Sequence, residues 1–142
     1  MAGNIPVVKI YNNLLVSIQI ELSDMLVNEL KEYICEEIQK HNPTGLIIEV
    51  SGVDILDSYI ARSIRDISQI AKLMGVKTLV VGLDPSMAIT LVEMGLNLSD
   101  LETTLNLESA LEILSQNNKN WDDFDIETDN TVLLKEDEEI GI

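Results

Sequence analysis

The sequence predicts one α/β domain with a mixed, mostly parallel β-sheet, about four helices packed on it and a β-hairpin at its start. Short β-branched apolar runs alternate along the chain with longer segments whose apolar residues recur every three or four positions, as strands alternate with helices. The apolar runs are unbroken, which is typical of strands that helices cover. Only two residues separate the first two runs, and this spacing favours an antiparallel hairpin.

The strands of the hairpin are expected at residues 7–11 and 14–20. The turn is expected at the asparagine pair 12–13, because asparagine tolerates left-handed backbone angles. The first helix is expected to begin at Ser23, a favoured N-cap residue, and to end at residues 41–43, where a proline cannot continue it. Its apolar stripe comprises Leu22, Met25 or Leu26, Leu30, Tyr33, Ile34 and Ile38, with Leu22 and Val27 as a hydrophobic staple.

The centre of the chain predicts a buried strand that leads into a second helix. The strand is expected at residues 45–50 and a small loop at residues 51–54. Asp57 then supplies an N-cap, and Ser58 stands on the first turn of the helix, at the carboxyl end of the strand. Regulatory chemistry and ligands gather at such positions, because free N–H groups and the positive end of the helix dipole favour an anion. The apolar positions of this helix are Ile60, Ile64, Ile67, Ala71 and Met74.

Two further strands and two further helices are expected in the rest of the domain. Gly75 is expected to end the second helix. Asp84 and Pro85 form a strong helix start, as an N-cap and a first helical residue. The expected elements are a strand at residues 77–81, a helix that ends at Gly95, a short strand at residues 103–105 and a helix capped by Asn106 that runs through Leu114.

Composition excludes several classes of protein. With 142 residues, 46% of them hydrophobic, the chain can bury one core but not two. Its net charge of −16 argues against binding to nucleic acid and to anionic membranes. No apolar run is long enough to span a membrane, and no signal peptide is indicated. The single cysteine, Cys35, suits a reducing cytoplasm.

Ser58 lacks a visible partner for nucleophilic catalysis. Such a serine needs an adjacent base, and the one histidine, His41, precedes the central strand while Ser58 follows it. The glycines form no phosphate-binding loop, and there is no Cys/His cluster for zinc. We therefore expect no enzyme activity, no cofactor and no metal. Ser58 is then either an ordinary first-turn residue or a hydroxyl that another protein phosphorylates.

The central strand, the loop and the Asp57-Ser58 helix start resemble the STAS domain of bacterial anti-sigma-factor antagonists. Stand-alone antagonists usually carry Asp-Ser-Ser/Thr-Gly, whereas Tyr59 and Ile60 follow Ser58 here. The resemblance covers about residues 5–115 and is closest to the RsbS-like stressosome branch. The stretches that narrow it to this branch are residues 5–19, 57–62 and 71–95.

The resemblance implies a non-enzymatic cytoplasmic phosphoprotein in stress signalling. In that family, a serine or threonine after an aspartate at this helix start accepts phosphate from a partner serine kinase, which implies Ser58 as the phosphoacceptor. The protein would assemble with further copies of itself and with RsbR-like STAS proteins, hold an RsbT-like serine kinase, and release it when phosphorylated. The residues expected to flank the site or to contact the partner are Asp54, Asp57, Tyr59, Arg62, Arg65 and Ser86.

Alternatives exist for these residues and for the function. Asp54 and Asp57 also suit a turn and a cap, Arg62 and Arg65 a solvated helix face, and Ser86 an ordinary first turn. One alternative function is a stand-alone anti-sigma-factor antagonist that an anti-sigma kinase phosphorylates on the same serine. Another is a module that binds a small molecule or nucleotide at the same helix N-terminus.

Residues 117–142 are expected to form an acidic, flexible tail after a domain at residues 1–116. The tail holds nine acidic residues and two lysines, so it carries −7 of the net charge. The resemblance implies no role for it.

Overall fold

The structure, a computed structural model, describes residues 5–19, 23–54, 56–95 and 101–116. The chain divides into two compact units, Met1–Ala110 and Leu111–Ile142, and the β-sheet belongs to the first. None of the helices in the described ranges is long and apolar enough to cross a membrane. The elements are β1 (Val7–Ile10), β2 (Asn13–Ser17), α1 (Asp24–His41), β3 (Gly45–Glu49), α2 (Ser58–Leu73), β4 (Lys77–Val81), α3 (Pro85–Glu93) and β5 (Glu102–Thr104), and residues 107–116 are also helical.

The five strands form one sheet in the order β1-β2-β3-β4-β5. β1 and β2 pair in antiparallel fashion, and every pair from β2 to β5 is parallel. The predicted mixed sheet with an N-terminal hairpin is therefore confirmed. Leu46, Ile47 and Ile48 of the central strand β3 are all fully buried, although neighbouring side chains point to opposite faces. This two-sided burial explains why the apolar run of β3 is unbroken.

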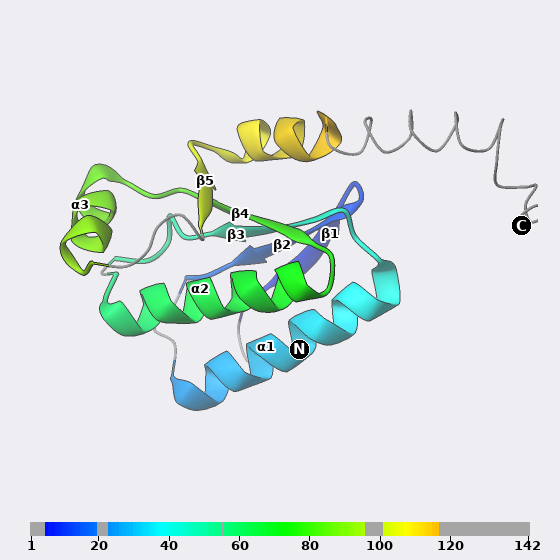
Figure 1. Cartoon of the computed structure of the whole chain (residues 1–142), viewed down its shortest axis with the longest axis horizontal. Coiled ribbons are helices and arrows are strands. Elements are labelled where there is room, and N and C mark those ends of the chain that lie inside the picture. Colours follow the sequence, from blue (N-terminus) through cyan, green and yellow to red (C-terminus); the bar gives the residue numbers. More distant parts are fainter. Residues whose placement is uncertain (1–4, 20–22, 55, 96–100, 117–142) are drawn as a thin grey trace, which may run out of the picture. The chain divides into compact units, whose positions relative to one another are not determined.

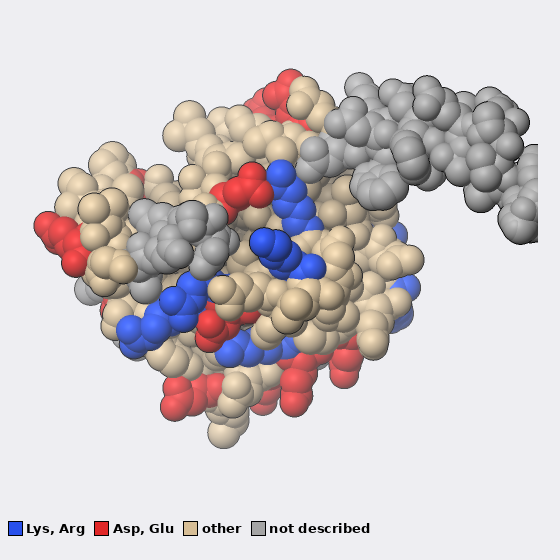
Figure 2. Space-filling model, viewed as in Figure 1, with Lys and Arg blue, Asp and Glu red and all other residues tan. Residues whose placement is uncertain are grey.

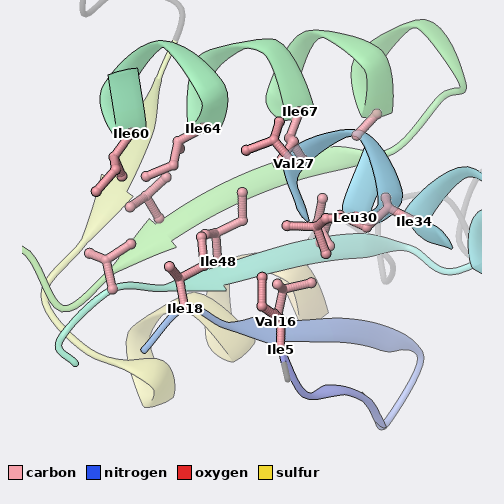
Figure 3. Close-up of a cluster of buried hydrophobic side chains, with 14 of the residues drawn as sticks. Ile5, Val16, Ile18, Val27, Leu30, Ile34, Ile48, Ile60, Ile64 and Ile67 are labelled. Carbon is pink, nitrogen blue, oxygen red and sulfur yellow. The ribbon is translucent and has the colours of Figure 1, made fainter. Parts of the chain in front are cut away.

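Helices α1 and α2 lie on the same face of the sheet (Figure 1). Their apolar side chains meet those of the strands in one buried cluster (Figure 3). Burying a side chain of this size contributes about 1.5–3 kcal/mol relative to leaving it exposed. The cluster therefore holds α2, and with it the start of α2, against the sheet. Its members include Val27, Leu30, Ile34 and Ile38 of α1, Ile60, Ile64, Ile67 and Ala71 of α2, and Leu14, Val16, Leu46, Ile48 and Val80 of the strands.

The hairpin turn differs from the prediction, which placed it at residues 12–13. The turn consists of Tyr11 and Asn12, and Asn13 begins β2 as a buried residue opposite Ile10. Tyr11, rather than an asparagine, takes the left-handed conformation, with φ at 54°. The reason lies in the sheet, because Asn13 also pairs with Gly45 of β3 and this parallel register sets where β2 starts.

The remaining elements agree with the prediction to within about two residues wherever they are described, with one exception at the end of β2. β2 ends at Ser17 instead of continuing to residue 20. Of the two alternatives predicted for one position of the α1 stripe, Met25 is 72% exposed, whereas Leu26 packs against the core; Val27 is also buried there. The predicted staple at Leu22 and the predicted tail at residues 117–142 lie outside the described residues.

Candidate functional site

Ser58 is the first residue of α2 and lies at the surface. Asp57 is the N-cap, with φ −95° and ψ 175°, and its Oδ1 accepts a hydrogen bond from the Ile60 N–H at 2.8 Å. The predicted cap is therefore confirmed. Ser58 is partly exposed, whereas Ile60 and Ala61 just beyond it are buried in the core. Ser58 is therefore partly accessible at the start of a formed helix.

A second helix start lies at the same edge of the sheet. β3 and β4 are parallel neighbours, so their carboxyl ends meet, and α2 and α3 both begin there (Figure 1). Asp84 caps α3, its Oδ1 accepting from the Met87 N–H at 2.8 Å, and Ser86 is exposed on the first turn. Asp54 is exposed in the loop after β3. The structure therefore brings Asp54, Asp57, Ser58 and Ser86 to one edge.

The loop that precedes Ser58 is held by Glu49, at the end of β3. The Glu49 carboxylate accepts from the Ser51 N–H at 3.0 Å and from the Ser17 hydroxyl at 3.4 Å. Gly82, which follows β4, has φ +90°, and a Cβ there would lie 2.8 Å from Glu49 Oε2 and 2.9 Å from Ser51 N. The sequence did not predict this support, although a glycine at the end of a buried strand was a usable signal.

A groove of about 310 Å³ runs between α1 and α2 beside the start of α2. Tyr59 and Arg62, two of the predicted contact residues, line it. Partial desolvation, together with the Asp24 carboxylate at the start of α1, raises the pKa of the Tyr59 phenol above its usual value of 10. Asp24 was not predicted as a site residue, because nothing in the sequence shows which helices become neighbours. The other lining residues are Val27, Asn28, Lys31, Ser63 and Asp66.

Basic side chains gather over α2 in a chain that is strongly acidic overall (Figure 2). Arg62 is exposed, and Arg65 is partly buried with its Nη2 3.7 Å from Asp66 Oδ1. Lys31 of α1 reaches the same carboxylate, with its Nζ 3.6 Å from Asp66 Oδ2. Ion pairs this long and exposed add little stability. Together, the side chains of Lys31, Arg65 and Asp66 carry one net positive charge on the surface of α1 and α2.

The histidine lies at the opposite end of the central strand from Ser58. His41 ends α1 just before β3 and its Nε2 is 3.3 Å from Glu37 Oε1, whereas Ser58 follows β3. It therefore cannot take a proton from the Ser58 hydroxyl. Among the described residues, no group of three or more His, Cys, Asp or Glu side chains could hold a metal ion.

This combination of fold and helix start matches a known family. The family model for the STAS domain matches residues 4–110. The chain belongs to the STAS domain family. This STAS protein is 38% identical over 69 residues to the uncharacterized protein YezB of Bacillus subtilis, covering 49% of the chain and 70% of YezB. It is 26% identical over 108 residues to the RsbT co-antagonist protein RsbRA of the same organism. That match covers 75% of the chain but only 39% of RsbRA.

This STAS protein is similar in structure to an RsbS protein and to a stressosome chain. The S58E variant of Moorella thermoacetica RsbS superimposes with a TM-score of 0.71 and 32% identity, over 82% of this chain and 99% of that one. A chain from the molecular architecture of the stressosome, described as a signal integration and transduction hub, gives a TM-score of 0.70 and 35% identity. That match covers 78% of this chain and 96% of the stressosome chain.

Proposed function

We propose that this STAS protein is an RsbS-like stressosome scaffold that holds an RsbT-like serine kinase and releases it when Ser58 is phosphorylated. The observation that carries the proposal is Ser58 itself, a partly exposed serine on the first turn of α2 with Asp57 as the cap. The likeness to RsbS over nearly the full length of that relative supports it. The protein would be a non-enzymatic, cytoplasmic substrate of the kinase and would need no cofactor.

Phosphate at Ser58 would change the charge of the contact surface sharply. A phosphoserine adds about −1.5 to −2 charges at neutral pH. The free N–H groups at the start of α2 favour this charge, whereas the carboxylates of Asp54 and Asp57 oppose it. An anion buried without a counter-charge in a protein contact raises the dissociation rate. Phosphorylation would therefore release the kinase without unfolding the domain.

The surface that holds the kinase would extend from Ser58 along the outer face of α2. Tyr59 and Arg62 line the groove next to the serine, and Arg65 lies one turn further along. Ser86 and Asp54 would complete the contact from the neighbouring loops at the same sheet edge. RsbR-like STAS proteins would join this chain in a large mixed assembly, as the similarity to RsbRA and to the stressosome chain suggests.

The decisive experiment is phosphorylation of the full chain by its cognate RsbT-like kinase with ATP. Intact-mass analysis is expected to find one phosphate, and fragment mapping is expected to place it on Ser58. Ser58→Ala should abolish the added mass, whereas Ser86→Ala, at the matched helix start, should retain it. Ser58→Glu should weaken retention of the kinase about tenfold or more. Phosphate found only at other positions would refute the proposal.

A stand-alone anti-sigma-factor antagonist is the second candidate, because an anti-sigma kinase could phosphorylate the same residue, Ser58. The size of the complex formed with an RsbR-like partner distinguishes the two candidate functions. The scaffold is expected to form a very large complex with an RsbR-like partner, measured by light scattering after gel filtration. An antagonist would remain a monomer or dimer in the same mixture.

A further inference from the structure

A second pocket lies at the far end of α2 from Ser58. It has a volume of about 630 Å³, within the range of about 300–1,000 Å³ that is usual for small-molecule sites. The C-terminal half of α2, the turn into β4 and the start of β5 form its walls. The lining residues are Ser68, Gln69, Lys72, Leu73, Gly75, Val76, Lys77, Thr78 and Glu102.

Thr78 gives this pocket a buried hydroxyl without a partner. Thr78 is only 6% exposed, and its Oγ1 is buried and makes no hydrogen bond within the described part of the chain. Its side chain shares a sheet face with Val80 of the core, which is the face that α2 covers. A buried hydroxyl left unpaired lowers the stability of the fold, because it has lost its hydrogen bonds to water. This hydroxyl is covered in the structure, so an oxygen or nitrogen of a ligand reaches it only when the side chains at the pocket wall shift.

The other polar groups of the pocket are mainly donors. Lys72 and Lys77 supply two ammonium groups, and Gln69 and Ser68 supply an amide and a hydroxyl. Glu102 is the one carboxylate in the lining, and its Oε1 already pairs with Lys77 Nζ at 3.3 Å. The pocket therefore has one net positive charge, which favours an anion.

The end of α2 does not cancel this preference. A helix C-terminus presents carbonyl groups that repel anions. Here Met74, Gly75 and Val76 donate their N–H groups to the last carbonyls of α2, those of residues 70–72. Backbone donors therefore satisfy three of the last four carbonyls of α2, which reduces their repulsion of an anion. Leu73, which is 89% exposed, adds an apolar wall beside the lysines.

We propose that this pocket binds a small organic oxyanion, a carboxylate or a phosphate ester. Its anionic group lies between the ammonium groups of Lys72 and Lys77, and one of its oxygens accepts a hydrogen bond from the Thr78 hydroxyl. Ser68 lies ten residues after Ser58 on α2, which is about 15 Å along the helix axis. The ligand and the partner at Ser58 can therefore bind at the same time.

The test is an NMR titration of the isotopically labelled full chain at constant ionic strength. The probes are inorganic phosphate, adenosine monophosphate and citrate, each to millimolar concentration. At least one of the two organic probes is expected to give saturable shifts in the amides of residues 72–78, with those of Asp57 and Ser58 unmoved, and saturation by inorganic phosphate alone would contradict an organic ligand. Saturation by adenosine monophosphate alone identifies a phosphate ester, and saturation by citrate alone identifies a carboxylate. No saturable shift with any probe, or shifts confined to the start of α2, overturns the proposal.

Matched variants distinguish specific binding in the pocket from non-specific attraction of anions to positive charge. Thr78→Val keeps the side-chain shape, so it is expected to leave the melting temperature equal or higher while weakening binding about tenfold. Lys72→Met is expected to weaken binding by a similar factor. Lys40→Met removes the corresponding lysine from the last turn of α1 and should leave binding unchanged. Equal effects of the two lysine variants, or full affinity in Thr78→Val, would overturn the proposal.

Discussion

Asp57 and Ser58 have separate roles at the start of α2. The Asp57 carboxylate binds the N–H of Ile60 and so starts the helix, while the Ser58 side chain is left at the surface. The cap was predictable because a side chain three residues away satisfies a local donor, whatever the rest of the chain does. The caps at Ser23, Asp84 and Asn106 were predictable for the same reason.

The turn at Tyr11 shows the limit of local reasoning. Asparagine is the residue that usually takes a positive φ, so the prediction placed the turn one residue late. The pairing of Asn13 with both neighbouring strands overrode this preference. The support of the loop before Ser58 by Glu49 and Gly82 was missed for the same reason, because it depends on contacts between strands.

Two glycines with similar backbone angles allow a matched test of how Gly82 and Glu49 support the loop before Ser58. Gly82→Ala is expected to destabilise the fold more than Gly75→Ala. Both have positive φ, +90° and +84°, so each variant bears a left-handed strain of about 1–2 kcal/mol. Only the new Cβ at position 82 would clash, with Glu49 and Ser51, since nothing lies within 4 Å of the Cβ at position 75.

Urea unfolding of both variants measures the difference. The Gly82 variant is also expected to lower the rate of Ser58 phosphorylation, because it displaces the loop that leads to α2. Equal losses of unfolding free energy in the two variants would show that the close approach of Glu49 does not matter.

At the scale of elements, the helices and strands followed from periodicity, whereas the surfaces between them did not. The buried positions of α2 were predicted from their spacing, because a helix on a sheet buries one stripe. The groove between α1 and α2 also needs Asp24, Lys31 and Asp66, whose roles depend on how the two helices lie together. Of the groove residues, only Tyr59 and Arg62 were predicted as contact residues.

The raised pKa of Tyr59, caused by partial desolvation and by the Asp24 carboxylate, gives the domain a pH dependence at high pH. The pKa of Tyr59 is raised in the folded chain, so folding favours the protonated phenol. This stabilisation is complete below the unfolded-state pKa of about 10 and is lost as the pH rises through the higher folded-state value. Asp24→Asn is expected to lower the folded pKa of Tyr59, measured from the ring carbon shifts by NMR.

Tyr59→Phe is the companion variant and should reduce the loss of unfolding free energy above pH 10. Tyr33→Phe, on the other helix of the pair, serves as the control and should leave the Tyr59 titration unchanged. A Tyr59 titration that does not respond to Asp24→Asn would mean that the two side chains do not interact.

At the scale of the whole molecule, negative charge is denser in residues 117–142 than in the rest of the chain. Residues 117–142 carry −7 of the net charge of −16. We propose that the domain extends over residues 1–116, past the end of the first compact unit at Ala110 to the end of the helix at residues 107–116, and that residues 117–142 add nothing to its stability. Removing them is expected to leave the melting temperature unchanged or slightly raised, because self-repulsion falls. Calorimetry of the two chains measures this, and a clear loss of stability would place the boundary later in the sequence.

The sequence by itself determined what depends on near neighbours along the chain. The strands, the amphipathic helices, the caps and the placement of Ser58 on a first turn all follow from periodicity and from donors and acceptors a few residues apart. Only the tertiary structure decided which strands pair, which helices share a groove, and that Thr78 has a buried hydroxyl beside a pocket. These features depend on groups far apart in the chain, whose contacts are set by packing and register and leave no local pattern.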